Sequence, residues 1–382
     1  MRNLSLLSGL GLSLLVSSVT AHAGGLTNHR SDFGKLTDGT PIEKYTLSNS
    51  HGMKVSVITY GAVLQSVIVP DKQGTADDVL LGFDDPQSYQ KNADPHFGAT
   101  IGRYGNRIAD GTFSLDGKTY KIPLNAGPNA MHGGPKGFDT HVWKATPVNY
   151  KDSVGVTLTY VSPDGDMGFP GTLNTQVTYS LNEQNELSIH FHATTDKPTV
   201  LNLTNHGYYN LAGAGNGTIL DQVAILHASH YTPVSAKLIP TGVLAPVVGT
   251  PMDFLEPTPI GTHIKDDHPQ LKFAEPAQGG FDFNYVLDSH GDLSKPAVEI
   301  SDPVSGRHLQ LFTSQPAVQF YTSNSLDGTI LGKGGKVYQH WGAFALEAEH
   351  FPDSPNQPGF PSTRLDPGQV FSQTTVLKFT HD

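Results

Sequence analysis

The chain lacks cysteine, clusters of basic residues, and long apolar runs beyond its first two dozen positions. Because none of its 382 residues is cysteine, disulfides and thiolate chemistry are excluded, and stability must come from a hydrophobic core. The 24 Lys and Arg residues against 35 Asp and Glu give a net charge of -11. With no basic patch, nucleic acid and anionic membrane are unsuitable partners. No interior segment reaches the roughly 18 to 20 apolar residues that span a bilayer.

The first 23 residues have the pattern of a secretory signal peptide. Arg2 precedes an apolar stretch that runs to Val19, and Ala21-His22-Ala23 fits a small-x-small cleavage site. We therefore expect residues 1–23 to be cleaved and the protein to be exported, to the periplasm or the medium, with no membrane partner afterwards. No low-complexity linker divides residues 24–382, so we expect them to form a single domain.

Turn-forming residues are abundant and evenly spread. The 41 glycines and 27 prolines cut the chain into short segments, which disfavours long helices. Several segments alternate apolar and polar residues, as half-buried strands do. The clearest are residues 53–60, 62–70, 155–161, 175–181 and 186–195, and the best helical candidate is short, at 85–92. These patterns predict an all-β fold, which we interpret as a large antiparallel β-sandwich.

Two loop segments carry residues suited to binding. IGRYGNRIADG places Arg103 and Arg107 in a glycine-rich turn, where a guanidinium could either bind ligand oxygens or tie loop backbone together. NAMHGG sets His132 before two glycines, which let a backbone approach a ligand closely. The alternative for His132 is a solvent-exposed loop histidine, and these two segments alone do not decide between the interpretations.

Three further segments carry ionisable residues in apolar surroundings. His206 in LNLTNHGYYNL could be a catalyst or fill a turn, and Asp282 lies between two phenylalanines in GGFDFNY. In ALEAEH, strand alternation would put Glu347 and Glu349 on one face. This pair could include a general base, or it could belong to a solvated face of the strand.

The HFH segment places two histidines, His190 and His192, on one face of a predicted strand. Such a pair could join a metal site. The strand's apolar residues occupy its other face, so the pattern favours two solvated side chains instead.

Charged, amide and aromatic side chains together suit a carbohydrate, which offers hydroxyls for hydrogen bonds and apolar faces for stacking. Six segments, GRYGNRIADGTFSLDG, MHGG, NLTNHGYYNL, GGFDFNY, QPAVQFYTSN and LEAEHFPDSPN, resemble in order and separation the signatures of the aldose 1-epimerases, also called galactose mutarotases. The resemblance runs from about Thr37 to the C-terminus. It implies a supersandwich of the galactose mutarotase kind, with no metal and no organic cofactor.

The resemblance also implies residue roles. The substrate-binding residues would be Arg107, Asn106, Asp282 and Gln319, and the catalytic residues Glu347, His206 and His132. The family reaction interconverts the α and β anomers of free aldohexoses such as galactose and glucose by opening and reclosing the ring. Glu347 would be the base at the C1 hydroxyl, His206 the acid at the ring oxygen and His132 a second donor. An unperturbed imidazole pKa of about 6.5 would suit this role with little shift.

Some alternatives stay open at this point. The protein could be an exported carbohydrate-binding protein without catalysis, or an epimerase of a phosphorylated sugar, although the low basic count argues against the latter. Glu349 stands where relatives frequently carry glutamine, which adds a charge beside the base. We expect a monosaccharide as the partner and a monomer or homodimer as the assembly.

Overall fold

The computed structural model describes residues 19–21, 25–274 and 279–382. The predicted signal peptide therefore lies outside the described residues, apart from the three-residue strand Val19–Ala21.

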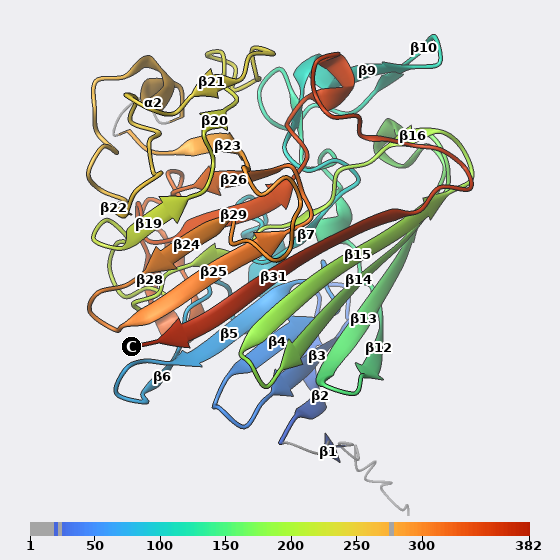
Figure 1. The fold of residues 1–382 in the computed structure, drawn as a ribbon. Coiled ribbons are helices and arrows are strands. Elements are labelled where there is room, and N and C mark those ends of the chain that lie inside the picture. The colour runs from blue at the N-terminus through green and yellow to red at the C-terminus, as the bar shows by residue number, and fades with distance from the viewer. Residues whose placement is uncertain (1–18, 22–24, 275–278) are drawn as a thin grey trace, which may run out of the picture.

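The largest sheet has nine strands and crosses the molecule diagonally in Figure 1. Its strands, in spatial order, are β12 (Lys144–Asn149), β13 (Ser153–Ser162), β14 (Leu173–Asn182), β15 (Glu186–Thr195), β31 (Phe371–His381), β25 (Arg307–Thr313), β24 (Val298–Ser301), β19 (Val223–Leu226) and β22 (Thr258–Pro259). The C-terminal strand β31 joins the two halves of this sheet, because it pairs with β15 on one side and β25 on the other.

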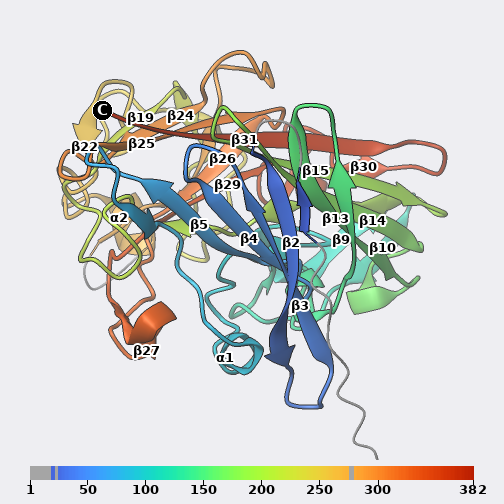
Figure 2. The same cartoon turned by 90° about the horizontal axis from the view of Figure 1, so that it is seen from below.

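A six-stranded sheet from the N-terminal part of the chain lies below the nine-stranded sheet in Figure 1 and faces the viewer in Figure 2. Its strands follow sequence order: β1 (Val19–Ala21), β2 (Thr27–Lys35), β3 (Pro41–Ser48), β4 (Lys54–Ile58), β5 (Leu64–Pro70) and β6 (Ala76–Asp78).

A second six-stranded sheet carries most of the acidic segments singled out in the sequence. Its order is β18 (Tyr208–Tyr209), β29 (Phe344–Glu349), β26 (Ala317–Tyr321), β23 (Asp282–Val286), β20 (His230–Tyr231) and β21 (Ala245–Pro246). Short two-stranded ladders complete the fold: β7 (Thr100–Ile101) with β17 (Thr204–Asn205), β8 (Arg107–Ile108) with β11 (Ala130–Met131), β9 (Thr112–Leu115) with β10 (Lys118–Lys121), β16 (Thr199–Val200) with β30 (Arg364–Leu365), and β27 (Ile330–Leu331) with β28 (Val337–Tyr338).

Helices are few and short in the described residues. They are α1 (Pro86–Lys91), α2 (Pro269–Ala274) and the 3-10 turns η1 (Ala109–Gly111), η2 (Phe138–Thr140), η3 (Asp166–Gly168), η4 (Lys333–Gly335) and η5 (Ser354–Asn356). Helix α1 begins after Asp85, whose carboxylate accepts a hydrogen bond from the Ser88 amide at 2.8 Å and caps the helix. The helix predicted at 85–92 is confirmed.

The core follows from the alternation read in the sequence. In β14 every second side chain from Leu173 to Leu181 is buried, and β15 repeats the pattern from Leu187 to Thr195. The hydrophobic residues among them belong to a cluster of buried side chains that also takes in strands of both six-stranded sheets, including Val57 and Phe320. The ladders between strands are antiparallel, so the predicted all-β antiparallel sandwich is confirmed.

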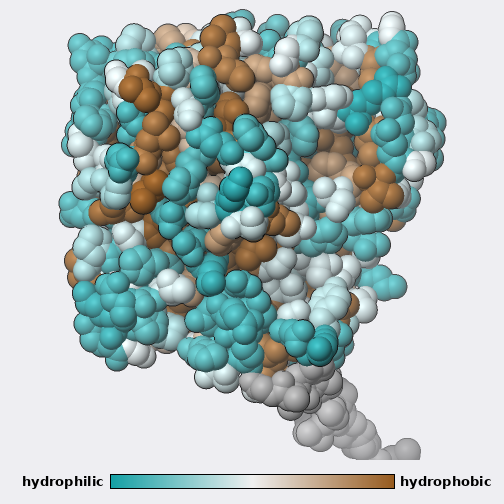
Figure 3. Space-filling model, viewed as in Figure 1, coloured by the Kyte–Doolittle hydropathy of each residue, from teal (hydrophilic) through white to brown (hydrophobic). Residues whose placement is uncertain are grey.

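The surface is mostly hydrophilic on the face shown in Figure 3, where hydrophobic side chains form separate strips. Scattered exposed residues such as Val248 and Val304 fit this pattern, which is ordinary for a folded chain. Within the described residues, no helix has the length and apolar character that crossing a membrane requires.

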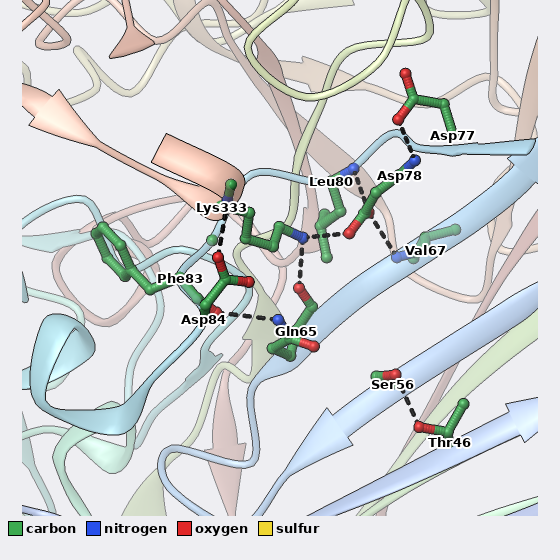
Figure 4. A network of polar contacts seen from close by, with 12 residues as sticks. Thr46, Ser56, Gln65, Val67, Asp77, Asp78, Leu80, Phe83, Asp84 and Lys333 are labelled. Atoms are coloured by element: carbon green, nitrogen blue, oxygen red, sulfur yellow. Dashed lines mark hydrogen bonds and ion pairs between the residues drawn. The ribbon is translucent and has the colours of Figure 1, made fainter. Parts of the chain in front are cut away.

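A polar network fastens η4 to the N-terminal sheet (Figure 4). The Lys333 ammonium lies 2.6 Å from an Asp78 carboxylate oxygen and donates to the Gln65 carbonyl at 2.7 Å. The Gln65 side-chain amide in turn donates to the Phe83 carbonyl at 3.0 Å. The network thus connects segments far apart in sequence, since 255 positions separate Lys333 from Asp78.

Candidate active site

Three adjacent strands place three of the predicted residues side by side. In the register of β26 and β29, Gln319 lies opposite Glu347, and β23 contributes Asp282 at its first position. The Gln319 side-chain amide donates a hydrogen bond to the Asp282 carboxylate at 2.6 Å. Sheet register therefore brings together residues that are up to 65 positions apart in the chain.

Strand β29 is buried on both faces. Leu346 and Ala348 face Phe191 and Leu377 of the nine-stranded sheet. Alternation turns Glu347 to the opposite side, toward a cavity that it lines. Its exposure is 2%, and that of its neighbour Glu349 is 0%, so the alternative of a solvated acidic face is wrong.

The Asn106-Arg107 turn and the His132 turn form one unit. Met131 pairs with Arg107 in the β8–β11 ladder, and the His132 amide donates to the Asn106 carbonyl at 3.0 Å. The Asn106 amide donates back to Nδ1 of His132 at 3.2 Å. Arg107 extends toward β23, with its Nη2 lying 3.6 Å from an Asp282 carboxylate oxygen.

His206 lies between the short strands β17 and β18. Its backbone amide donates to the Ala99 carbonyl at 2.9 Å, and its ring stacks on Tyr208 with centroids 4.9 Å apart. Nε2 of His206 lies 3.5 Å from a carboxylate oxygen of Glu347. His206 is thus a buried group in contact with the acidic strand, rather than a residue that fills a turn.

These side chains line one cavity of about 540 Å³. Six of the seven predicted site residues contribute to its wall: Asn106, Arg107, His132, His206, Asp282 and Glu347. Gln319 is not among the lining residues and lies behind Asp282, which it holds by the hydrogen bond already described. Its direct contact with sugar stays a prediction, whereas its contact with Asp282 is part of the structure.

The sequence model of the aldose 1-epimerase family matches residues 43–378. The chain belongs to the aldose 1-epimerase family. Galactose mutarotase from Rattus norvegicus is 42% identical over 352 residues, which cover 92% of this chain and 98% of the relative. Aldose 1-epimerase from Escherichia coli K12 is 39% identical over 344 residues, covering 90% and 96%. The chain is therefore an enzyme, an isomerase of the aldose 1-epimerase class.

Solved structures of epimerases agree with this fold. A GalM/aldose epimerase homologue from C. elegans superposes with a TM-score of 0.79 at 32% identity, covering 87% of this chain and 97% of that one. Galactose 1-epimerase from Lactobacillus acidophilus NCFM gives a TM-score of 0.82 at 28% identity, covering 94% and 99%. The predicted supersandwich of the galactose mutarotase kind is confirmed.

Burial controls the acid–base properties of the epimerase cavity. Burial, followed by the charges of Glu349 and Asp282, raises the pKa of Glu347 well above its ordinary value, and Arg107 opposes this effect. Burial also raises the pKa of Glu349 to about 8. The Glu349 carboxylate accepts hydrogen bonds from the side-chain amides of Asn106 at 3.0 Å and Asn202 at 3.3 Å.

The histidines of the epimerase cavity shift in the opposite direction. Burial, with a smaller effect of His96, lowers the pKa of His206 to about 3, and burial lowers the pKa of His132 well below its ordinary value. The expectation that these imidazoles need little shift is therefore wrong, because neither ring has the solvent that stabilises its cation. Neutral histidines in the cavity therefore face a carboxyl group whose protonated form is favoured.

His132, His206 and Glu347 could together hold a metal ion by distance, since their ligand atoms lie within 4.8 Å of one another. The tautomer of His132 argues against this. Its Nδ1 accepts the hydrogen bond from Asn106, so the neutral ring carries its proton on Nε2, which leaves no lone pair for a metal there. The pair His190 and His192 is not part of a metal-capable group in the described residues.

The two arginines of the glycine-rich turn have different roles. Arg103 is 2% exposed, and its guanidinium donates to backbone carbonyls of the 162–171 segment, including Ser162 and Gly171 at 2.9 and 2.7 Å. Arg103 therefore ties loops together, whereas Arg107 reaches the cavity. The sequence interpretation left both options open for both residues, and the structure assigns one to each.

Sequence reasoning missed His96, which lines the cavity on the loop before β7. Its ring centroid lies 4.9 Å from that of His132 and 6.0 Å from that of His206. The available signal was weak: in DPHFGAT, His96 shortly precedes a glycine, as His132 does, but the segment belongs to none of the six motifs.

Proposed function

We propose that this epimerase interconverts the α and β anomers of free aldohexoses such as galactose and glucose, by acid–base opening and reclosure of the ring. The observation that carries the proposal is the buried contact of 3.5 Å between Nε2 of His206 and the Glu347 carboxylate, inside a cavity that also holds Arg107 and Asp282. The names of the relatives, galactose mutarotase and aldose 1-epimerase, point to the same reaction.

In the proposed reaction the Glu347 carboxylate removes the proton from the C1 hydroxyl while His206 protonates the ring oxygen. The bond from C1 to the ring oxygen breaks as the C1 carbonyl forms, and rotation about the bond from C1 to C2 exposes the other face. Reclosure runs the two proton transfers in reverse, so the enzyme ends as it began. No covalent intermediate is required.

The reaction needs one proton shared by Glu347 and His206. Burial favours the neutral forms of both groups, which places this proton on the carboxyl group. Transfer across the 3.5 Å contact gives the carboxylate and the imidazolium that the proposed roles require. Arg107 favours the carboxylate form because its positive charge lowers the pKa of Glu347.

His132 would support the reaction as a hydrogen-bond donor. Because its Nδ1 accepts from the Asn106 amide, the neutral ring presents an Nε2–H group to the cavity. Such a donor can bind a sugar oxygen without first gaining a proton. Arg107 and Asp282 would hold hydroxyls remote from C1 and fix the ring while C1 remains free to turn.

The charges of the cavity favour a neutral sugar over a sugar phosphate. Its basic lining residues are Lys91 and Arg107, whereas its acidic ones are Asp94, Asp282, Asp327 and Glu347. A phosphate group carries about two negative charges at neutral pH and would meet this acidic excess. The alternative of a phosphorylated substrate is therefore disfavoured.

Polarimetry of freshly dissolved α-galactose and α-glucose tests the proposal. We expect the wild type to equilibrate both sugars faster than buffer and Glu347→Gln to lose roughly 10² to 10⁴-fold in kcat, the usual contribution of a positioned proton-transfer group. His190→Asn, on the outer face of β15, serves as the control and should keep wild-type activity. Sugar binding measured by calorimetry without faster equilibration would instead support a carbohydrate-binding protein, and full activity of Glu347→Gln would refute the assigned base.

Export is proposed on residues 1–23 alone. Expression of the full chain in a bacterial host, followed by cell fractionation and N-terminal sequencing, tests it. We expect a mature form that begins near Gly24 outside the cytoplasm. An uncleaved cytoplasmic protein would overturn this proposal and leave the catalytic one intact.

A further inference from the structure

His96 forms part of the cavity wall beside both histidines assigned to the reaction. Its ring meets the His132 ring edge-on, with centroids 4.9 Å apart and planes at 72°, and lies 6.0 Å from the ring of His206. The side chain retains 14% exposure, and the residue lines the cavity. A sugar that reaches His132 and His206 must therefore also pass close to His96.

Asp139 fixes the orientation of this ring. Nδ1 of His96 lies 3.1 Å from an Asp139 carboxylate oxygen. Among the described residues this is the one hydrogen bond of the Asp139 carboxylate, whose side chain is only 10% exposed. A buried carboxylate needs a donor, so Nδ1 of His96 carries the proton. Nε2 then remains as the polar atom of His96 that is available to a ligand.

The backbone holds His96 against the His206 segment. The Gly98 amide donates to the His206 carbonyl at 2.8 Å, and the His206 amide donates to the Ala99 carbonyl at 2.9 Å. Gly98 has a φ of +67°, and a Cβ atom there would lie 2.0 Å from the Leu64 carbonyl oxygen, so the turn needs glycine. His96 itself has a φ of +53°, an uncommon conformation for a non-glycine residue.

We propose that His96 is a further sugar-binding residue, which hydrogen-bonds a sugar hydroxyl through Nε2 and thereby takes part in selecting among aldoses. Asp139 is its positioning residue, because it acts on the sugar only through the ring of His96. The inference rests on the proposed function in one respect: the ligand is taken to be the aldose in the same cavity. The contact that it adds lies in the cavity wall beside His132.

The test combines kinetics with binding on the full-length enzyme. His96→Leu removes the polar edge of the ring, and we expect the KM for galactose to rise about three- to tenfold with kcat nearly unchanged, as for one lost hydrogen bond that is equal in the ground and transition states. Calorimetric Kd values for galactose should rise by the same factor. The analogues 2-, 3-, 4- and 6-deoxygalactose each lack one hydroxyl. The analogue that lacks the hydroxyl bound by His96 should bind wild type and His96→Leu with equal Kd, and it thereby identifies that hydroxyl.

Asp139 variants separate positioning from direct contact. Asp139→Ala should raise KM by part of the His96→Leu effect. Asp139→Asn should keep KM close to the wild-type value, because its amide oxygen still accepts from Nδ1 of His96. The double variant His96→Leu/Asp139→Ala should have the same KM as His96→Leu alone. His190→Leu is the matched control, since Nδ1 of His190 is also held by a side chain, Thr374 at 3.0 Å, but outside the cavity. Thermal unfolding of each variant verifies that it is folded.

The outcomes distinguish this inference from the proposed function. Unchanged KM and Kd in a folded His96→Leu protein would overturn the assignment of His96, as would a fall in kcat at constant KM, which would place it in the chemical step. A wild type that binds galactose without accelerating mutarotation would overturn the proposed reaction, while the Kd comparison would still test His96. Additive effects of the His96 and Asp139 variants would refute positioning by Asp139.

Discussion

At the residue scale, the site depends on carboxyl groups that the fold removes from water. Glu347 and Glu349 are two positions apart on β29 and both buried, so each disfavours the charge of the other. The Glu349 carboxylate also accepts a hydrogen bond from the side-chain amide of Asn106, and the backbone amide of Asn106 donates to Nδ1 of His132. A Cβ atom at Gly105 would lie 2.9 Å from the Glu349 carboxylate, which shows how closely the turn approaches it.

Glu349→Gln should move the pH profile of the reaction. The Glu349 charge is the second cause that raises the pKa of Glu347, so its removal lowers that pKa. The reaction needs the proton that Glu347 and His206 share, so kcat/KM should fall as rising pH removes this proton, and Glu349→Gln should shift the fall to lower pH. The glutamine oxygen can still accept from Asn106, so activity on the plateau below this fall should change little.

Polarimetric rates between pH 4 and 9 test this shift, with Glu349→Leu as the comparison, because leucine also loses the Asn106 hydrogen bond and should lower the plateau. A profile of Glu349→Gln that coincides with the wild type would show that Glu349 does not influence the base.

At the scale of elements, the cavity is held by contacts between segments far apart in the chain. The η4 turn is joined to β6 and β5 by Lys333, whose ammonium contacts Asp78 and the Gln65 carbonyl (Figure 4). The side chains of Lys333 and Asp78 are 12% and 22% exposed, so solvent screens the pair only in part. Ile330, close to this turn, lines the cavity, so the network supports its outer wall.

Lys333→Met should lower the free energy of unfolding by about 1–3 kcal/mol, because it leaves one oxygen of the partly buried Asp78 carboxylate and the Gln65 carbonyl without the Lys333 donor. Lys336→Met is the control in the same segment, since Lys336 is exposed, and it should change stability by less than about 0.5 kcal/mol. Urea unfolding followed by fluorescence measures both. Equal stability of the two variants would mean that the buried contact contributes nothing.

At the scale of the whole molecule, stability comes from an extended apolar core without any covalent cross-link. The main cluster of buried side chains draws on all three large sheets, and the chain has no cysteine. The N-terminal strand β1 adds little to this structure, since it pairs through three residues with β2 alone.

Removal of residues 1–23 should therefore leave the folded enzyme intact. We expect the free energy of unfolding of the shortened protein to lie within about 0.5 kcal/mol of that of the full chain, because β1 pairs with one neighbouring strand through three residues. Its mutarotation rate should also be unchanged. A loss of several kcal/mol in the free energy of unfolding would show that β1 is part of the stable fold.

Size-exclusion chromatography on the same sample would test the predicted monomer or homodimer.

Much of the fold could be predicted from the sequence because strands leave a local signal. The alternation at 186–195 matches β15 to the residue, and the segments at 155–161 and 175–181 lie within β13 and β14. Alternation reports which side chains share a face, and this depends only on the two-residue period of a strand. The six motifs likewise identified six residues that line the cavity, but they missed His96 and included Gln319, which lies behind Asp282.

What the sequence by itself determined was the strand pattern, the family and the identity of six cavity residues. Only the tertiary structure decided that the Glu347 face of β29 is buried, since that depends on loops from residues 96–107 and 202–206 packing over it. It also decided that Arg103 supports loops while Arg107 reaches the cavity, and that His96 joins His132. Burial, charge proximity and pKa arise from contacts between distant segments, and no local pattern encodes them.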